Sequence, residues 1–164
     1  MKAVKEKNRT VTFYWPSPVG PLGVTAEGRN LTRVFFAPDC LLDNTAEPGE
    51  GFQRAFCQLA EYFAGQRRNF RLPLAPSGTG FQLRVWAALK EIPYGQTLSY
   101  GALATLAAAP RAFRAVGQAC RRNPLAIIIP CHRAVGQDGR LTGFAGGLAV
   151  KDFLLRLEAG EPVR

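Results

Sequence analysis

The first part of the chain contains short apolar and alternating runs that predict a small β-sheet. These runs are Thr10–Trp15, Leu22–Ala26 and Leu31–Phe36, and many of their residues are β-branched or aromatic. The segments between them, at 16–21 and 28–30, are rich in turn-forming Pro, Gly, Ser and Asn. The pattern therefore predicts three strands joined by short turns.

A helix is predicted after these strands. Apolar residues recur at the i, i+3, i+4, i+7 and i+8 spacing of one buried helical face, and Gly65 ends the pattern. On this helix, Cys57 is expected to be a small buried hydrophobe. The residues of the predicted buried face are Phe52, Ala55, Phe56, Leu59, Ala60 and Phe63.

A segment rich in Pro, Gly and Ser at 73–80 marks a boundary between two predicted domains. The chain before it mixes strands with a helix, whereas the chain after it follows a mainly helical pattern. We therefore expect an N-terminal α/β domain at 1–76 and a C-terminal helical domain at 77–164. The fold class that follows is α+β.

The C-terminal domain is predicted to begin and to end with a helix. Thr79 and Gln82 match a capping box, and the apolar stripe that follows places Trp86 in the core. The last helix is predicted at Val150–Ala159, with Gly160 closing it. The residues expected to be buried on these two helices are Phe81, Val85, Trp86, Leu89, Val150, Phe153, Leu154 and Leu157.

Two further short helices lie between them. Ser99 is placed to cap a helix at Tyr100–Ala108, Ala109-Pro110 breaks it, and a second helix is predicted at Arg111–Arg122. Two short helices with a tight turn and arginines on the second suggest a helix-turn-helix. Helical hairpins are common, so this signal is weak alone.

Composition and charge narrow the class of protein. The 164 residues are 47% hydrophobic and 20% charged, as in globular proteins, and no apolar run approaches the roughly 20 residues that cross a bilayer. Met1–Lys7 carries charge without the apolar stretch of a secretory signal, so a cytoplasmic protein is expected. The net charge is +9, and no Asp or Glu lies between Glu91 and Asp138. This stretch is either a solvated basic face or a nucleic acid site, and the predicted helix-turn-helix favours DNA.

The cysteines and the single histidine favour nucleophilic chemistry over a metal site. None of the four cysteines forms a C-x-x-C pair, and one histidine adds little to a zinc site of four ligands. Cys131 follows an apolar run at 127–129, predicted as a strand, and precedes His132 and Arg133, which favour a thiolate. Adjacent strand residues face opposite ways, so the pair cooperates only if the chain turns or a water bridges it. The alternative is a chance Cys-His pair in a loop.

Motifs around this segment resemble those of the O6-alkylguanine-DNA alkyltransferases, the methylated-DNA–protein-cysteine methyltransferases. They follow one another nearly without gaps over 80–160, and the upstream segment at 17–22 resembles the family's N-terminal strand turn. The matching motifs are Phe81-x-x-x-Val-Trp86, Ile92-Pro-Tyr-Gly95, Ser99-Tyr-Gly101, Arg114-Ala-Val-Gly117, Asn123-Pro124, Pro130-Cys-His-Arg133 and Leu141-Thr-Gly-Phe-Ala-Gly-Gly147, followed by Lys151 and Glu158.

The resemblance implies a small ribonuclease-H-like α/β domain, then a helical, winged-helix-like domain with a helix-turn-helix. It implies transfer of a methyl or larger alkyl group from O6 of guanine in double-stranded DNA to Cys131. His132 would accept the thiol proton through a water, and Glu158 would orient and stabilise the imidazole. Tyr100 would donate a proton or hydrogen bond to the leaving guanine, and Asn123 would hold the turn before the cysteine loop.

The resemblance also implies base flipping, because a stacked guanine hides its O6 from a thiol. Arg114 matches the arginine finger that fills the vacated space; the alternative is a plain phosphate contact. Arg133 is left open between a phosphate contact and buried hydrogen bonds that serve the fold. Phe113 stands where alanine is frequent, and either wedges the DNA or crowds the groove. The other expected DNA-binding residues are Ser99, Arg111, Arg121 and Arg122.

The segment Gly143–Gly147 matches the family's active-site loop and lacks the residues of a phosphate-binding P-loop. Phe144 replaces a tyrosine that many members carry, which removes a hydroxyl near the lesion. Cys120 is expected to line the pocket rather than to act as a second nucleophile. The expected substrate pocket comprises Tyr100, Cys120, Ala134, Phe144, Ala145 and Gly146.

A thioether on Cys131 is stable, so the transfer is expected to be irreversible and to consume the protein. We expect no cofactor, and we do not expect the structural zinc that some family members carry. The protein is expected to be a monomer in solution. Clustering on DNA and repair of O4-alkylthymine stay open. The nearest alternative is a lesion-binding damage sensor without transfer, against which Cys131 counts. A Cys-His hydrolase has no use for an arginine-rich helix, and a plain helix-turn-helix regulator leaves the Pro-Cys-His-Arg segment unexplained.

Overall fold

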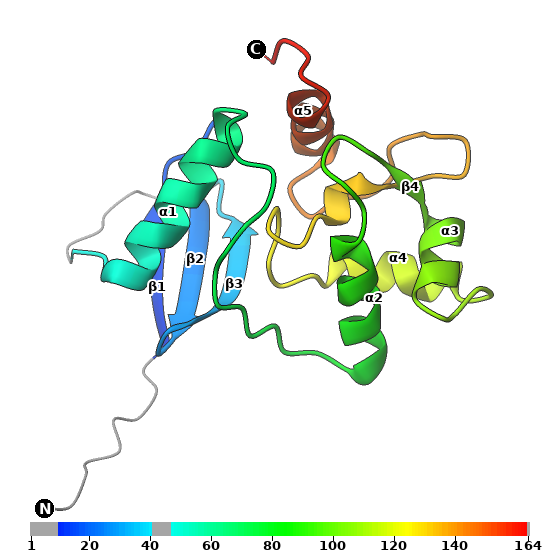
Figure 1. Cartoon of the computed structure of the whole chain (residues 1–164), viewed down its shortest axis with the longest axis horizontal. Helices are drawn as coiled ribbons and strands as arrows, with labels where there is room; N and C mark the ends of the chain where they lie inside the picture. The colour runs from blue at the N-terminus through cyan, green and yellow to red at the C-terminus, as the bar shows by residue number, and fades with distance from the viewer. Residues whose placement is uncertain (1–9, 41–46, 164) are drawn as a thin grey trace, which may run out of the picture.

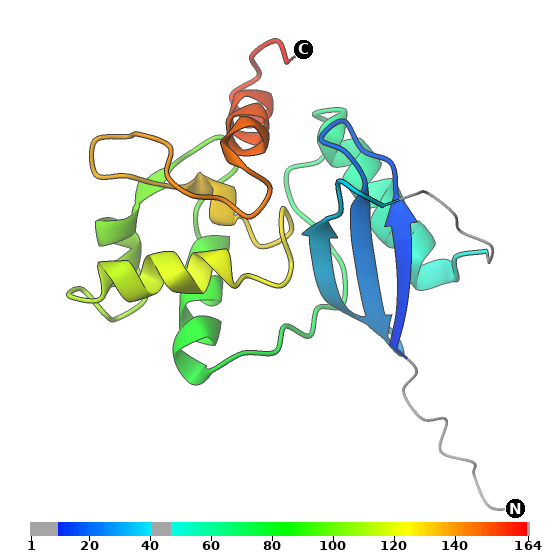
Figure 2. The same ribbon diagram turned by 180° about the vertical axis from the view of Figure 1, so that it is seen from behind.

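The N-terminal half of the computed structural model is a three-stranded sheet covered by one helix. The structure describes residues 10–40 and 47–163. Strands β1 (Thr10–Trp15), β2 (Leu22–Glu27) and β3 (Asn30–Phe36) pair antiparallel in that order. Helix α1 (Glu50–Phe63) lies along one face of this sheet (Figures 1 and 2). The predicted strands are confirmed to within a residue, whereas the predicted lack of a secretory signal concerns residues outside the described ranges.

Helix α1 buries a narrower face than its apolar pattern predicts. Ala55, Leu59 and Tyr62 are fully buried, and the ring of Trp15 stacks on Phe56 with centroids 6.1 Å apart. The prediction that Cys57 is buried is wrong: it is exposed, because two residues turn a helix by about 200° away from Ala55. Ala60 is exposed for a similar reason.

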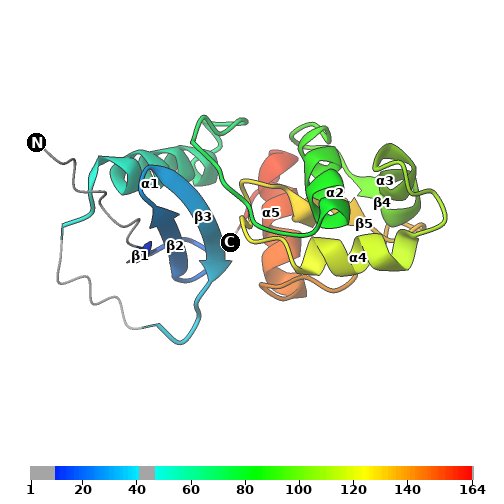
Figure 3. The same ribbon diagram turned by 90° about the horizontal axis from the view of Figure 1, so that it is seen from below.

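The C-terminal half is mainly helical and carries two short β-strands. Its elements are α2 (Gly80–Lys90), β4 (Leu98–Ser99), α3 (Tyr100–Leu106), α4 (Phe113–Arg121), the 3₁₀ helix η1 (Cys131–Arg133), β5 (Ala134–Val135) and α5 (Leu148–Glu158). Helices α3 and α4 pack together, and α3 lies on the side of this half farthest from the sheet (Figures 1 and 3). The α+β prediction is confirmed.

The capping signals of these helices are confirmed. Thr79 and Gln82 form the predicted capping box on α2, and Ser99 caps α3 by accepting a hydrogen bond from Ala102 N at 3.1 Å. The Nε1 of buried Trp86 donates to Ala119 O at 2.9 Å, which ties α2 to α4. Both short helices are shorter than predicted, because Ala108 has a φ of +55° and the following residues form a turn.

Helix α5 has a different inner face from the predicted one. Leu154 is fully buried as expected, whereas Val150, Phe153 and Leu157 are only partly buried. The buried positions beside Leu154 belong instead to Lys151 and Glu158. A charged side chain is seldom buried without a partner, so both residues are expected to be hydrogen-bonded inside the domain.

Backbone hydrogen bonds join the two halves. Val34 of β3 donates to Pro124 O at 2.8 Å, and Ala126 N donates back to Val34 O at 2.9 Å. The segment that precedes the predicted nucleophile therefore pairs with the edge of the N-terminal sheet. No helix in the described ranges is long and apolar enough to cross a bilayer.

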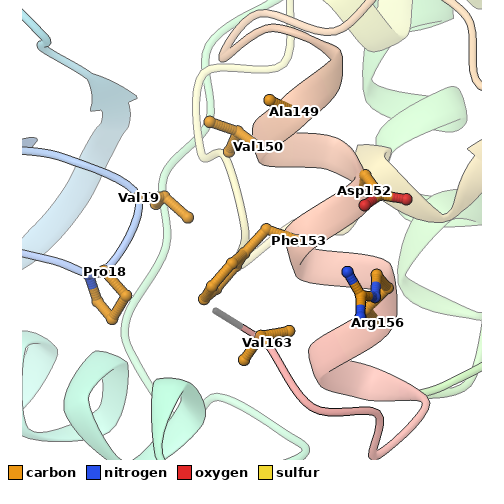
Figure 4. Close-up of a pocket in the computed structure, with 8 residues that line it drawn as sticks. All are labelled: Pro18, Val19, Ala149, Val150, Asp152, Phe153, Arg156 and Val163. Atoms are coloured by element: carbon orange, nitrogen blue, oxygen red, sulfur yellow. The ribbon is translucent and has the colours of Figure 1, made fainter.

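A groove of about 270 Å³ also lies between the halves (Figure 4). Pro18 and Val19 of the β1–β2 turn line one side, and Phe153 and Arg156 of α5 line the other. None of the residues that line this groove belongs to the predicted site. The candidate chemistry therefore lies elsewhere.

Candidate active site

The segment that leads to Cys131 is wound rather than extended. The prediction of a strand at 127–129 is wrong: Ile127 has a φ of +71°, and Ile129 N donates to Leu125 O at 2.8 Å within a series of turns. The three isoleucines are apolar because they are buried, and an apolar run cannot by itself distinguish a buried strand from a buried loop. The chain therefore turns before η1. A turn of the chain was one of the two alternatives, beside a bridging water, that would let Cys131 and His132 cooperate.

Asn123 holds this turn and contacts the predicted nucleophile. Its Oδ1 accepts from Leu125 N at 3.0 Å, and its Nδ2 donates to Ile129 O at 2.7 Å. The same Nδ2 lies 3.2 Å from Cys131 Sγ and donates to it. Asn123 therefore links the end of α4 to the cysteine, in the place where the resemblance puts it.

His132 and Glu158 form a buried pair. His132 Nε2 lies 2.8 Å from Glu158 Oε1, and both side chains are fully buried. A carboxylate only accepts hydrogen bonds, so Nε2 carries the hydrogen and Nδ1 keeps its lone pair. Nδ1 is buried and has no hydrogen-bond partner among the described residues. Burial lowers the pKa of His132 although the bond to Glu158 opposes this, so the imidazole is neutral and can accept a proton.

Glu158 is the centre of a larger network. Arg133 donates to it twice, from Nε to Oε2 at 2.8 Å and from Nη2 to Oε1 at 2.9 Å. Gly95 N donates to Oε2 at 3.1 Å, and the Tyr62 hydroxyl donates to Oε1 at 2.8 Å. Burial alone would raise the pKa of Glu158, but hydrogen bonds from His132 and Arg133 lower it to about 2. The carboxylate is therefore ionised at every physiological pH.

This network decides the open question about Arg133. Its guanidinium also donates to Ile92 O at 2.7 Å, and only 7% of the residue is exposed. A phosphate contact by Arg133 is therefore wrong, and the buried hydrogen bonds that serve the fold are confirmed.

The Cys131 thiol is buried beside a lysine. Burial raises the pKa of Cys131, while the hydrogen bond from Asn123 and the charge of Lys151 lower it. Lys151 is itself fully buried, and its Nζ donates to Ala134 O at 2.6 Å and to Thr142 O at 3.1 Å. This lysine places a positive charge near the Cys131 sulfur. Its two hydrogen bonds also join the segments at Ala134 and Thr142 to α5.

Tyr100 and Cys120 border the same region. The Tyr100 ring lies 5.7 Å from Lys151 Nζ. Burial raises the pKa of the Tyr100 hydroxyl, a hydrogen bond with Thr142 opposes this rise, and Cys120 and Cys131 add to it. Burial also raises the pKa of Cys120 to about 12, which keeps its thiol protonated. A protonated, buried thiol favours a lining role for Cys120.

The loop at 143–147 packs against the N-terminal sheet. The Phe144 ring meets Phe36 of β3 with centroids 5.5 Å apart, and a Cβ at Gly146 would lie 2.8 Å from the Phe36 ring. Ala145 is exposed, whereas Ala134 is fully buried in β5. The predicted pocket residues thus differ widely in exposure.

The predicted DNA-binding residues lie on or near α4, except for Ser99, which caps α3. Arg111, Arg114, Arg121 and Arg122 are exposed, with Arg111 in the turn before the helix. Phe113 at the start of α4 is 51% exposed, and the Arg114 guanidinium lies 5.7 Å from its ring centroid. The described part of the chain contains no group of three His, Cys, Asp or Glu side chains that could hold a metal.

Two family models account for nearly the whole described chain. The ribonuclease-like domain of 6-O-methylguanine DNA methyltransferase matches residues 11–76, and the DNA binding domain of the same family matches residues 80–160. The chain belongs to the 6-O-methylguanine DNA methyltransferase family.

Curated relatives and solved structures agree with this assignment. A methylated-DNA–protein-cysteine methyltransferase of Methanosarcina acetivorans is 48% identical over 150 residues, covering 87% of this chain and 94% of its own length. The constitutive methylated-DNA–protein-cysteine methyltransferase of Bacillus subtilis is 43% identical over 150 residues. That match covers 87% of this chain and 91% of the Bacillus protein. A crystal structure of Mycobacterium tuberculosis OGT in complex with DNA superimposes with a TM-score of 0.82 at 44% identity, covering 91% of this chain and 92% of that one.

Three residues of this methyltransferase that touch the site were not predicted from its sequence. Tyr62 lies on the apolar face of α1, where its hydroxyl gives no signal. Phe36 is the last residue of β3, and nothing in its sequence context distinguishes it from the other apolar strand residues. Lys151 could be recognised from the sequence, because it shares a helical face with Leu154 and Glu158 at i, i+3 and i+7.

Proposed function

We propose that this methyltransferase repairs O6-methylguanine in DNA by moving the methyl group onto its own Cys131. The observation that carries the proposal is the Cys131 sulfur held by Asn123 at 3.2 Å, next in the chain to a neutral histidine that is bonded to an ionised Glu158. Family membership supports the reaction, and the named activity of the relatives is the same.

The transfer uses one acid–base pair and one displacement. His132 accepts the Cys131 proton, through a water, and Glu158 stabilises the imidazolium that forms. The thiolate attacks the methyl carbon, so that a C–S bond forms while the C–O6 bond breaks and its electron pair leaves with the guanine. The guanine ring gains the proton that the thiol lost, assisted by a hydrogen bond from Tyr100. The products are S-methylcysteine and unmodified guanine.

The lesion reaches the thiol by flipping out of the duplex. The exposed Arg114 on α4 fills the space left in the stack, beside the exposed ring of Phe113. Ser99 and the remaining exposed arginines hold the phosphate backbone without reading sequence. That a relative was crystallised in complex with DNA supports this part of the proposal. Phe144 and Gly146 wall the pocket from the side of the N-terminal sheet.

The protein acts once, because the thioether on Cys131 is stable and the free thiol is not regenerated. It acts as a monomer. We divide the chain at 76/77, so that the nucleophile, base and DNA-binding helices all belong to the second domain. The alternative function is a damage sensor that binds the lesion without transfer.

The test is the intact mass of the protein after incubation with duplex DNA that contains O6-methylguanine. We expect a gain of one methyl group, located on the Cys131 peptide and saturating at one per chain. Cys131→Ser is the control that should gain nothing, and Cys120→Ser should gain one methyl like the wild type. Tight lesion-selective binding without a mass gain would replace the transferase by the sensor.

A further inference from the structure

One residue of the N-terminal domain reaches the carboxylate that supports His132. Tyr62 is fully buried on α1, and its hydroxyl donates to Glu158 Oε1 at 2.8 Å. The same oxygen accepts from His132 Nε2 at 2.8 Å. Tyr62 and the predicted base therefore share a single acceptor atom, although they are contributed by different domains.

The hydroxyl of Tyr62 is not needed to hold Glu158 in place. The Arg133 guanidinium already binds both carboxylate oxygens, at 2.8 and 2.9 Å, and Gly95 N fixes Oε2 at 3.1 Å. A paired fork of this kind defines the orientation of a carboxylate. With His132 and Tyr62 the carboxylate accepts five hydrogen bonds, three of them on Oε1, against about two lone pairs per oxygen.

The extra donor on Oε1 has an electrostatic consequence. Each donor draws negative charge away from the bond between this oxygen and His132. We propose that Tyr62 is a positioning residue of the methyl transfer, which acts through Glu158 by competing with His132 for Oε1, so that the imidazole stays neutral and able to take the Cys131 proton. This inference rests on the proposed function of His132 as the base.

Several other charged or titratable groups face this pair. Arg133 of η1 lies on Glu158, Lys151 of α5 acts on His132, and both lower the pKa of the imidazole. The Tyr94 ring lies 6.1 Å from that of Tyr62, and the guanidinium groups of Arg68 and Arg133 lie over it. Cys131 adjoins His132 in η1. All of these groups stay in place when only the Tyr62 hydroxyl is removed, so that the change isolates the shared oxygen.

The experiment uses the fact that the chain contains one histidine. The full-length protein labelled with ¹⁵N-histidine gives imidazole NMR signals from His132 alone, which report its tautomer and its pKa. In the wild type we expect a neutral ring with hydrogen on Nε2. In Tyr62→Phe we expect a higher pKa of His132, equivalent to about a tenfold higher proton affinity, since one hydrogen bond to a charged group is lost.

Single-turnover methyl transfer gives the second readout. In Tyr62→Phe the acidic limb of the rate–pH profile should move to higher pH by the same factor, while the rate on the alkaline plateau stays at or above that of the wild type. A merely structural role would lower the rate at every pH and leave the limb where it was. The matched control is Tyr94→Phe, which removes a neighbouring hydroxyl that does not bond to Glu158 and should shift neither the titration nor the limb.

A second variant keeps the hydroxyl and the packing. Tyr62→3-fluorotyrosine makes the phenol a stronger donor, so the pKa of His132 should fall and the limb should move to lower pH. An unchanged His132 titration in folded Tyr62→Phe, or shifts of the same sign in both variants, overturns the inference. Failure of the proposed function is distinct, because it appears as a wild type that takes no methyl group while its His132 titration can still be measured.

Discussion

The buried carboxylate of Glu158 should make a large, pH-dependent contribution to stability. The perturbation is Glu158→Gln, which keeps the shape of the side chain and removes its charge and its titration. Because the pKa of Glu158 falls from 4.5 to about 2 on folding, its ionised form stabilises the fold above pH 4.5, and this contribution is lost as the pH falls toward 2.

The size of the effect follows from the same values. A pKa lower by this amount corresponds to about 3 kcal/mol of unfolding free energy at neutral pH. The side chain of Glu158 is fully buried, so solvent does not screen the interaction. The loss of the Arg133 interaction is part of this value, because that guanidinium is one of the causes of the lowered pKa. The difference between wild type and variant should therefore be large at pH 7 and about 3 kcal/mol smaller near pH 2.

The assay is urea unfolding of both proteins, followed by circular dichroism at several pH values between 7 and 2. The other carboxyl groups titrate in both chains and cancel in the difference, which leaves the titration of Glu158 and of the His132 bonded to it. Asp138→Asn is the control: its exposed ion pair with Arg140 at 3.2 Å is worth at most about 1 kcal/mol. A difference between wild type and Glu158→Gln that stays constant over this pH range would refute the reasoning.

Three further predictions concern the site. Asn123→Ala removes the hydrogen bond to Cys131 Sγ and should slow single-turnover methyl transfer roughly tenfold by raising the thiol pKa; an unchanged rate would contradict this. Arg114→Ala should lower the transfer rate from duplex DNA roughly tenfold or more, yet leave transfer from the free O6-methylguanine base unchanged, since only the duplex requires flipping. Gly146→Ala places a Cβ 2.8 Å from the Phe36 ring and should cost about 1–3 kcal/mol of unfolding free energy. The cost should shrink in a Phe36→Ala background, and equal costs in the two backgrounds would exclude this contact as the cause.

The elements with strong periodicity were predictable from the sequence. The strands, α1 and the capped start of α2 depend on local patterns of apolar and capping residues, and these patterns carry the information. The prediction of a strand at 127–129 failed because burial in a loop and burial in a strand demand the same residue types. The turn there depends on Asn123, which holds Ile129 O from six residues away.

Part of the site could be predicted only by resemblance, and part not at all. Cys131, His132 and Asn123 lie close together in the sequence, so their contacts accompany the motifs. Tyr62 meets Glu158 across 96 residues of chain, and no local pattern encodes that contact. Lys151 was missed as an inward-facing residue, and Glu158 was placed at the site only by resemblance, because apolar periodicity leaves out charged residues even when they are buried and hydrogen-bonded.

The backbone pairing of Val34 with the 124–126 segment bears on how this protein folds. The stretch that precedes Cys131 completes its hydrogen bonds on an edge strand more than 80 residues earlier in the chain, as the Val34 N to Pro124 O and Ala126 N to Val34 O bonds show. A fragment that starts at Gly80 would retain the proposed nucleophile Cys131 and the exposed arginines of α4. It would lose the edge of β3, with which the segment before Cys131 pairs. The conformation of the segment that leads to Cys131 therefore depends on the N-terminal sheet as well as on the helices around it.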